Sequence, residues 1–150
     1  MTRTTAREIA VRFVFGQSEN PRGADEFLDE ALEPSYFATL RDEDEAFSEY
    51  PDERQLDYIG RLVRGVSEHS AELDAYIERY AVGWKFGRIS RSAVAIMKTA
   101  MYEVLYMPDV PTGAAINEAI ELSKRYEAPE TVPFINGVLG SFSRAEGEMP

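Results

Sequence analysis

The amino-acid sequence predicts an all-α fold, a compact bundle of about seven helices in two subdomains. Apolar residues recur three and four positions apart along most of the chain, which is the spacing of helices buried on one side. No run alternates between apolar and polar residues for long enough to require a strand. The chain has 150 residues and no cysteine, so helix packing rather than disulfide bonding has to hold the core together.

The first helix is expected to begin at Thr4 or Thr5, with Glu8 completing a capping box, and to end near Gly16. Five apolar residues define its buried stripe. They are Ala6, Ile9, Ala10, Phe13 and Val14. This pattern predicts a helix that buries one face and exposes the other.

Two arginines and one aromatic residue lie off that stripe. Arg3 and Arg7 are four residues apart and therefore share a face of the first helix. Phe15 falls on the side between Arg7 and Arg12, which predicts a partly exposed aromatic ring beside cations.

A strongly acidic window follows, and it contains the whole charge excess of a chain whose net charge is −11. A turn at residues 20–23 leads to a helix over residues 24–32, and a short helix precedes an acidic loop at residues 41–53. The acids of the window, opposed only by Arg41, are Asp25, Glu26, Asp29, Glu30, Glu33, Asp42, Glu43, Asp44, Glu45, Glu49, Asp52 and Glu53. The simplest interpretation is a solvated surface, and repulsion of non-cognate nucleic acid is the alternative. Because the remainder is close to neutral, a local RNA site is still allowed.

Five further helices are expected, over residues 52–68, 70–80, 90–105, 112–126 and 131–144. Ser70 and Ser90 are the predicted N-caps of two of them. The helix after Ser90 is nearly apolar all round and should be the central one. We place the subdomain boundary near residue 82, which divides the chain into residues 1–82 and 83–145 of a single domain.

Several short motifs, in this order and spacing, carry a family signal. They are Thr5-Ala6-Arg7-Glu8, Leu73-Asp74-Ala75-Tyr76-Ile77, Trp84 with Arg88-Ile89, Tyr102-Glu103, Ala115-Ile116-Asn117-Glu118-Ala119, Glu121-Leu122-Ser123-Lys124 and Phe134-Ile135-Asn136-Gly137-Val138-Leu139. Nearly end to end, the sequence resembles the NusB family of transcription antitermination factors. The resemblance implies a non-enzymatic helical protein that binds boxA RNA together with the ribosomal protein NusE and joins an RNA polymerase antitermination complex at ribosomal RNA operons. It implies no cofactor.

The resemblance also implies which residues contact RNA: Arg3, Arg7 and Phe15 on the first helix, and Lys124 and Phe134 near the last. Cations along the phosphates and aromatic faces for the bases are what single-stranded RNA requires. Alternatives stay open at each position. The arginines and the lysine can be ordinary solvated residues, and the two phenylalanines can fill packing gaps.

Four residues of the connection after residue 79 are assigned to the ribosomal-protein surface by the same resemblance: Tyr80, Trp84, Lys85 and Phe86. The alternative is that these aromatic rings fill core between helices. The N-terminal basic cluster is thinner than is usual in the family, and Phe15 keeps a stacking face without a tyrosine hydroxyl.

Catalytic and metal chemistry find little support in the residues. Asp74 and Glu103 lie on different expected helices without a histidine partner, so salt bridges or helix-end bonds suit them better. His69, the single histidine, is expected at a helix C-terminus with no companion ligands. Asn117 and Asn136 are expected to be at least half-buried and bonded to backbone at packing points, and Gly137 to allow close helix approach.

Two rival functions are kept. The same fold occurs as the N-terminal RNA-binding domain of a ribosomal RNA cytosine methyltransferase, so the chain can be a stand-alone RNA-binding module. The second rival function is storage, in a homodimer that buries the RNA-binding face. No apolar segment reaches the length of a membrane span or of a signal-peptide core, so the expected location is the cytoplasm, without membrane attachment.

Overall fold

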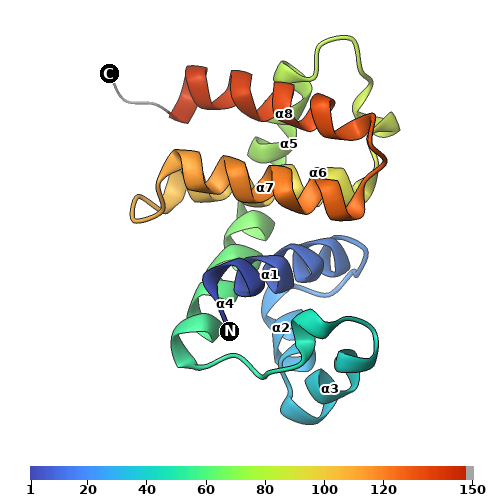
Figure 1. Ribbon diagram of the computed structural model, residues 1–150, viewed down its shortest axis with the longest axis vertical. Helices are drawn as coiled ribbons and strands as arrows, with labels where there is room; N and C mark the ends of the chain where they lie inside the picture. Colours follow the sequence, from blue (N-terminus) through green and yellow to red (C-terminus); the bar gives the residue numbers. More distant parts are fainter. Residues whose placement is uncertain (148–150) are drawn as a thin grey trace. The chain divides into compact units, whose positions relative to one another are not determined.

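The structure, a computed structural model, describes residues 1–147 and is all-α within that range, as the sequence predicts (Figure 1). Its α-helices are α1 (Arg3–Ser18), α2 (Ala24–Ala31), α3 (Pro34–Thr39), α4 (Glu53–Glu68), α5 (Ser70–Tyr80), α6 (Arg91–Tyr106), α7 (Thr112–Tyr126) and α8 (Thr131–Phe142). Shorter turns are η1 (Leu40–Asp42), η2 (Glu45–Phe47), η3 (Phe86–Arg88) and η4 (Ser143–Gly147). The described residues contain no β-strand.

The chain divides into two compact units, residues 1–68 and residues 69–150. The sequence suggested a boundary near residue 82, whereas this division falls between α4 and α5. The physical reason is that α5 packs against α6 and α8, so its apolar face belongs to the core of the second unit.

In the first unit, α1 packs mainly on α4, and the predicted stripe of α1 is buried, as are Arg7, Glu8 and Val11 outside that stripe. Ile9 and Ala10 are fully buried, as is Ile59 on α4. The expected cap of α1 was wrong: α1 begins at Arg3, and the Thr2 hydroxyl accepts a hydrogen bond from the Thr5 amide at 3.1 Å. Thr2 is as good a cap as Thr4 or Thr5, so local chemistry alone did not distinguish them.

The acidic window is more ordered than a solvated loop. Phe47, inside the expected loop, is only 3% exposed, and its ring packs against Phe37 with centroids 5.4 Å apart. Asp44 caps η2 by accepting from the Ala46 amide, and its other oxygen pairs with Arg12 at 2.9 Å. Apolar anchors therefore hold this segment against α1 while most of its carboxylates stay at the surface.

In the second unit, α6 is the central helix and α5, α7 and α8 all pack on it. Ser90 caps α6 by accepting from the Ala93 amide, as predicted. The predicted cap of α5 was wrong. Ser70 is the first residue of α5, and its hydroxyl accepts from Lys98 Nζ at 2.7 Å, so a tertiary contact uses it in place of the helix end.

An ion pair joins α5 to α6. Lys98 Nζ lies 2.9 Å from Asp74 Oδ1, and the two side chains are 9% and 34% exposed. This confirms the structural interpretation of Asp74. A pair so little hydrated is costly to break, because removing one partner leaves the other charge poorly solvated.

We expect Lys98→Met to destabilise the second unit by about 3 kcal/mol, the low end for a buried pair because Asp74 keeps some water contact. Urea unfolding followed by fluorescence measures this, since Trp84 is the single tryptophan and lies in that unit. In the double variant with Asp74→Leu most of the loss should be recovered. Losses that simply add in the double variant would contradict the coupling.

Candidate nucleic-acid interface

The start of α1 carries a cation held over an aromatic face. The Arg3 guanidinium lies 4.1 Å from the ring centroid of Tyr58 on α4, and the Arg7 guanidinium lies 5.8 Å from the same ring. Tyr58 is 5% exposed, so its ring is a fixed support. A positive charge over a desolvated ring is attracted by the ring's negative face, which helps to orient both arginines.

Arg3 and Arg7 differ in exposure. Arg3 is exposed, whereas Arg7 is 4% exposed. Arg3 therefore offers its guanidinium to solvent, whereas Arg7 lies in the core behind it. A depression of about 190 Å³ adjoins Arg3, lined also by Asp52, Gln55 and Tyr58. Asp52 and Gln55 form a capping box at the start of α4. Each side chain accepts a hydrogen bond from the backbone amide of the other residue.

Phe15, at the other end of α1, is 38% exposed, as its helical position predicts. A ring with this exposure keeps one face for stacking. Within residues 1–147 it stacks on no other aromatic ring.

In the second unit the structure brings together two residues that the sequence assigned to different partners. The rings of Trp84 and Phe134 lie with centroids 4.7 Å apart at an interplanar angle of 45°. Trp84 is 54% exposed and Phe134 is half-buried. Core filling, the alternative for Trp84, is thereby excluded for most of its indole. We call Trp84 and Phe134 the aromatic platform.

Gly83 makes the platform possible. It has φ of 84°, the left-handed region that glycine adopts without steric cost, and it lies three residues after the end of α5 at Tyr80. The Trp84 amide then donates to the Ala81 carbonyl at 3.1 Å, which closes a turn. The chain leaves α5 sharply and places Trp84 beside Phe134, in the first turn of α8.

The remaining predicted partner residues are close in sequence and differ in environment. Lys85 is exposed and Phe86 is half-buried. Tyr80 donates its hydroxyl to Glu146 Oε2 at 2.6 Å, and this bond raises the pKa of Tyr80 above its ordinary value. Tyr80 is therefore tied to the segment after α8, and Lys85 is the one of the three with a fully exposed side chain.

Lys124, predicted to contact phosphate, pairs with Glu121 on the same helix at 2.8 Å. The two side chains are 58% and 67% exposed, so water and salt screen the pair and it holds the lysine only weakly. A phosphate can compete with Glu121 for this cation.

Three motif residues expected in helix packing are at the surface. Asn117 and Asn136 are exposed, and a Cβ added at Gly137 would meet no atom within 4 Å. The expectation that they serve the core was wrong. Small and polar residues of these types are common where helices pack closely. These three lie on the solvent-facing sides of α7 and α8, opposite the buried stripes.

The sequence did not reveal a ring cluster around His69. His69 directly follows the last residue of α4, at a helix C-terminus as expected, and also precedes α5. It stacks on Tyr106 with ring centroids 4.2 Å apart. Tyr102 lies 5.1 Å from Tyr106, and the Tyr106 hydroxyl donates to Glu72 at 2.6 Å. The sequence does show that Tyr102 and Tyr106, four residues apart on one helix, share a face. Only the packing of α5 against α6 shows that His69 lies beside them.

Neither a metal centre nor a membrane span is found in the described part of the chain. No three His, Asp or Glu side chains converge as metal ligands among residues 1–147. No helix in that range combines the length and the apolarity needed to cross a bilayer.

Comparisons with known proteins agree over nearly the whole chain. A family profile described as the NusB family matches residues 4–144. Transcription antitermination protein NusB of Carboxydothermus hydrogenoformans is 38% identical over 140 residues, covering 93% of this chain and 91% of the relative. The protein of the same name from Agathobacter rectalis is 36% identical over 143 residues, covering 95% and 100%. Neither name is that of an enzyme, in agreement with the sequence-based expectation.

A solved structure of T. maritima NusB is similar in fold. Its TM-score to this chain is 0.80 at 25% sequence identity, and the match covers 99% of this chain and 94% of that one.

The Tyr106–Glu72 bond makes a prediction about titration. It raises the pKa of Tyr106 from 10.0 to about 12, because ionisation would place a phenolate beside a carboxylate. The stabilisation is therefore complete below pH 10 and is lost as pH rises through about 12. We expect Glu72→Gln to return the Tyr106 pKa toward 10.0 in an ultraviolet absorbance titration, with Tyr106→Phe identifying the transition. Glu78→Gln on the same helix is the matched control, and equal effects of both glutamine variants would contradict the assignment.

Proposed function

Because this chain belongs to the NusB family, we propose that it is a transcription antitermination factor that binds boxA-type single-stranded RNA together with the ribosomal protein NusE. The complex joins the RNA polymerase antitermination complex and promotes processive transcription of ribosomal RNA operons, in the cytoplasm. The observation that carries the proposal is the family match over residues 4–144, with relatives of matching length named as antitermination proteins.

The proposed RNA contacts in the first unit are Arg3, Arg7 and Phe15. Exposed Arg3 neutralises a phosphate, and Tyr58 supports it from below at 4.1 Å. Arg7 is buried against the same Tyr58 ring, at 5.8 Å, and backs Arg3 from the core side. Phe15, 38% exposed, offers a face on which a base stacks.

The proposed RNA contacts in the second unit are Phe134 and Lys124. Phe134 leans on Trp84, so a base stacking on the aromatic platform meets a preorganised surface rather than a lone mobile ring. Lys124 neutralises a phosphate by leaving Glu121, and their exposed pair is weak enough for that exchange.

The proposed NusE contacts are Tyr80, Trp84, Lys85 and Phe86. Since Trp84 and Phe134 touch, the protein and RNA surfaces of the second unit share an edge. NusE bound there lies next to the RNA, and two proteins then hold one strand. A second attachment to the same strand acts at a high effective concentration and strengthens binding without new contacts on this chain.

The proposal is tested by titrating a labelled boxA RNA with the protein, with and without purified NusE, at two salt concentrations. We expect weak binding alone, roughly tenfold or more tightening with NusE, and weaker binding at higher salt. A scrambled RNA of the same composition is the control. Equal affinity for both RNAs in the presence of NusE would defeat the proposal, as would a stable dimer that excludes RNA.

Two variants separate the surfaces within that experiment. Arg3→Ala should weaken binding with and without NusE and lower the salt slope by about one, while Arg41→Ala in the acidic window should change neither. Trp84→Ala should weaken binding in both conditions if the indole stacks on a base, and only with NusE if it contacts the protein. Stacking losses are roughly 1 to 3 kcal/mol per base.

Glu130, exposed immediately before α8, opposes RNA binding at the aromatic platform. Its side chain caps no amide, so its carboxylate contributes mainly negative potential. We expect Glu130→Asn to tighten boxA binding roughly twofold to fivefold at low salt, with the gain shrinking as salt screens it. Asparagine is a favoured N-cap, so α8 should not be weakened. Asp42→Asn is the control, and unchanged affinity of Glu130→Asn across the salt series would sink the idea.

A further inference from the structure

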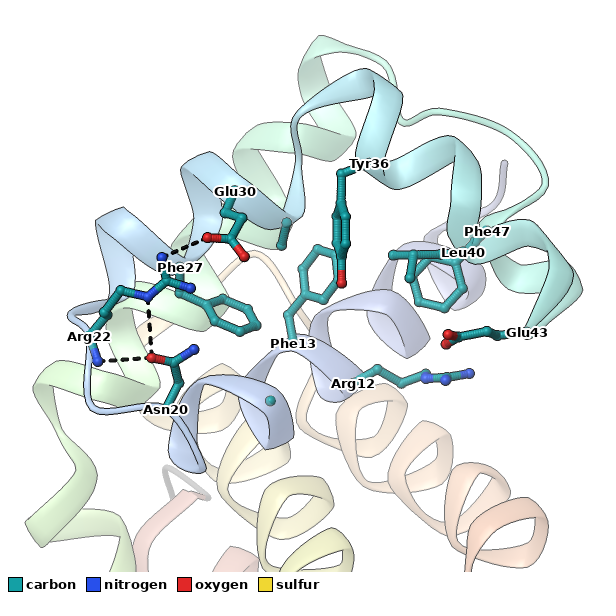
Figure 2. Close-up of a pocket in the computed structure, with 12 residues that line it drawn as sticks. Arg12, Phe13, Asn20, Arg22, Phe27, Glu30, Tyr36, Leu40, Glu43 and Phe47 are labelled. Atoms are coloured by element: carbon teal, nitrogen blue, oxygen red, sulfur yellow. Dashed lines mark hydrogen bonds and ion pairs between the residues drawn. The ribbon is translucent and has the colours of Figure 1, made fainter.

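A pocket of about 330 Å³ lies wholly within the first unit, between α1, α2 and the segment from α3 to η2 (Figure 2). Its lining combines charged and polar side chains with large apolar ones, most of them aromatic. They include Phe13, Phe27, Tyr36, Leu40 and Phe47. Figure 2 shows the Tyr36 side chain reaching into the middle of the pocket, with Phe27 on one side and Leu40 on the other. Phe13 and Phe47 are nearly fully buried, whereas Tyr36 is 45% exposed.

The pocket is preformed by packing that the core needs in any case. Phe13 meets Phe27 edge to face at 5.9 Å and lies 6.1 Å from Phe47. Gly16 completes one wall, and a Cβ there would approach Phe27 to 3.0 Å. An apolar side chain entering the pocket therefore meets fixed rings and loses little entropy to ordering them.

The rim is charged, and its cations are already neutralised. Arg22 pairs with Glu30 at 2.6 Å, which lowers the pKa of Glu30, and Arg12 pairs with Asp44 at 2.9 Å. Glu43 lines the pocket, is exposed, and pairs with no cation among residues 1–147. The net charge at the rim is thus negative.

The wider surroundings have the same sign. The pocket is formed largely by residues of the window from Asp25 to Glu53. That stretch of the sequence contains twelve carboxylates and one arginine. A phosphate or an RNA strand would be repelled here. A cationic ligand would be attracted electrostatically. If the ligand also carried an apolar group between its positive charges, the aromatic lining would bind that group.

We propose that this pocket docks a basic segment of a protein partner, which inserts one aromatic or aliphatic side chain against Tyr36 and Phe27 and places a lysine or arginine against Glu43. Charge complementarity selects the occupant, and the apolar anchor fixes its register. This interaction goes beyond the RNA and NusE contacts proposed above, none of which uses the pocket. It gives the acidic window, otherwise an unexplained concentration of like charge, a binding role.

The test uses the full chain and two synthetic peptides, one with a single phenylalanine flanked by lysines and one with serine in place of the phenylalanine. Binding is followed by fluorescence anisotropy and by amide shifts in heteronuclear NMR spectra. We expect the phenylalanine peptide to bind, to move the amide of Gly16 and those of its neighbours in the pocket, and to bind roughly tenfold more tightly than the serine peptide.

Variants distinguish docking from general attraction to an acidic surface. Glu43→Lys should weaken the phenylalanine peptide roughly tenfold, whereas Asp42→Lys, the adjacent exposed acid outside the lining, changes the net charge equally and should cost about twofold or less. Tyr36→Ala should remove the preference for phenylalanine over serine. Circular dichroism checks that each variant is folded.

Three outcomes would overturn the proposal: no binding of the phenylalanine peptide, equal losses for Glu43→Lys and Asp42→Lys, or amide shifts confined to residues outside the pocket. Displacement of the peptide by a boxA oligonucleotide that shifts the same pocket amides would assign the pocket to RNA instead.

Discussion

The arrangement of the second unit depends on one ion pair, between Lys98 on α6 and Asp74 on α5. Most of the buried residues of α6 are apolar, and apolar contacts tolerate small shifts along or around the helix. The pair is directional, because a 2.9 Å contact between two poorly hydrated charges is lost if α5 slides by a fraction of a turn. It fixes the register of α5 against α6, and after α5 ends Gly83 turns the chain so that Trp84 reaches Phe134.

In the first unit a similar role falls to arginines on α1, used in two ways. Arg12 pairs with Asp44 and draws the acidic segment onto the helix, whereas Arg3 rests on the Tyr58 ring and needs no carboxylate. The first arrangement cancels charge and the second preserves it. One helix can thus border an acidic, aromatic-lined pocket near Arg12 and still present a cationic surface at its start.

Burial divides the motif residues by role in a way their identities do not. Ala115, Ala119, Ile135 and Leu139 are all in the core, and Asn117 and Asn136, between them in sequence, are exposed. The helical period separates the two sets. A motif that identifies a family therefore mixes packing residues with surface residues, and only the surface set is available to a partner. Lys124, Trp84 and Phe134 belong to that set at least in part.

The sequence by itself determined the all-α class, the buried stripe of α1, the bounds of α7 and the Ser90 cap, because these follow from helical periodicity and from hydrogen bonds between near neighbours. It did not determine that Ser70 serves Lys98, that Arg7 is buried, or that Trp84 and Phe134 form one platform. Each of those joins residues from different helices, and helical periodicity carries no information about which helix packs against which. The pocket beside Tyr36 has the same origin. Its lining comes from α1, α2, α3 and both turns that follow, so it exists only in the tertiary structure.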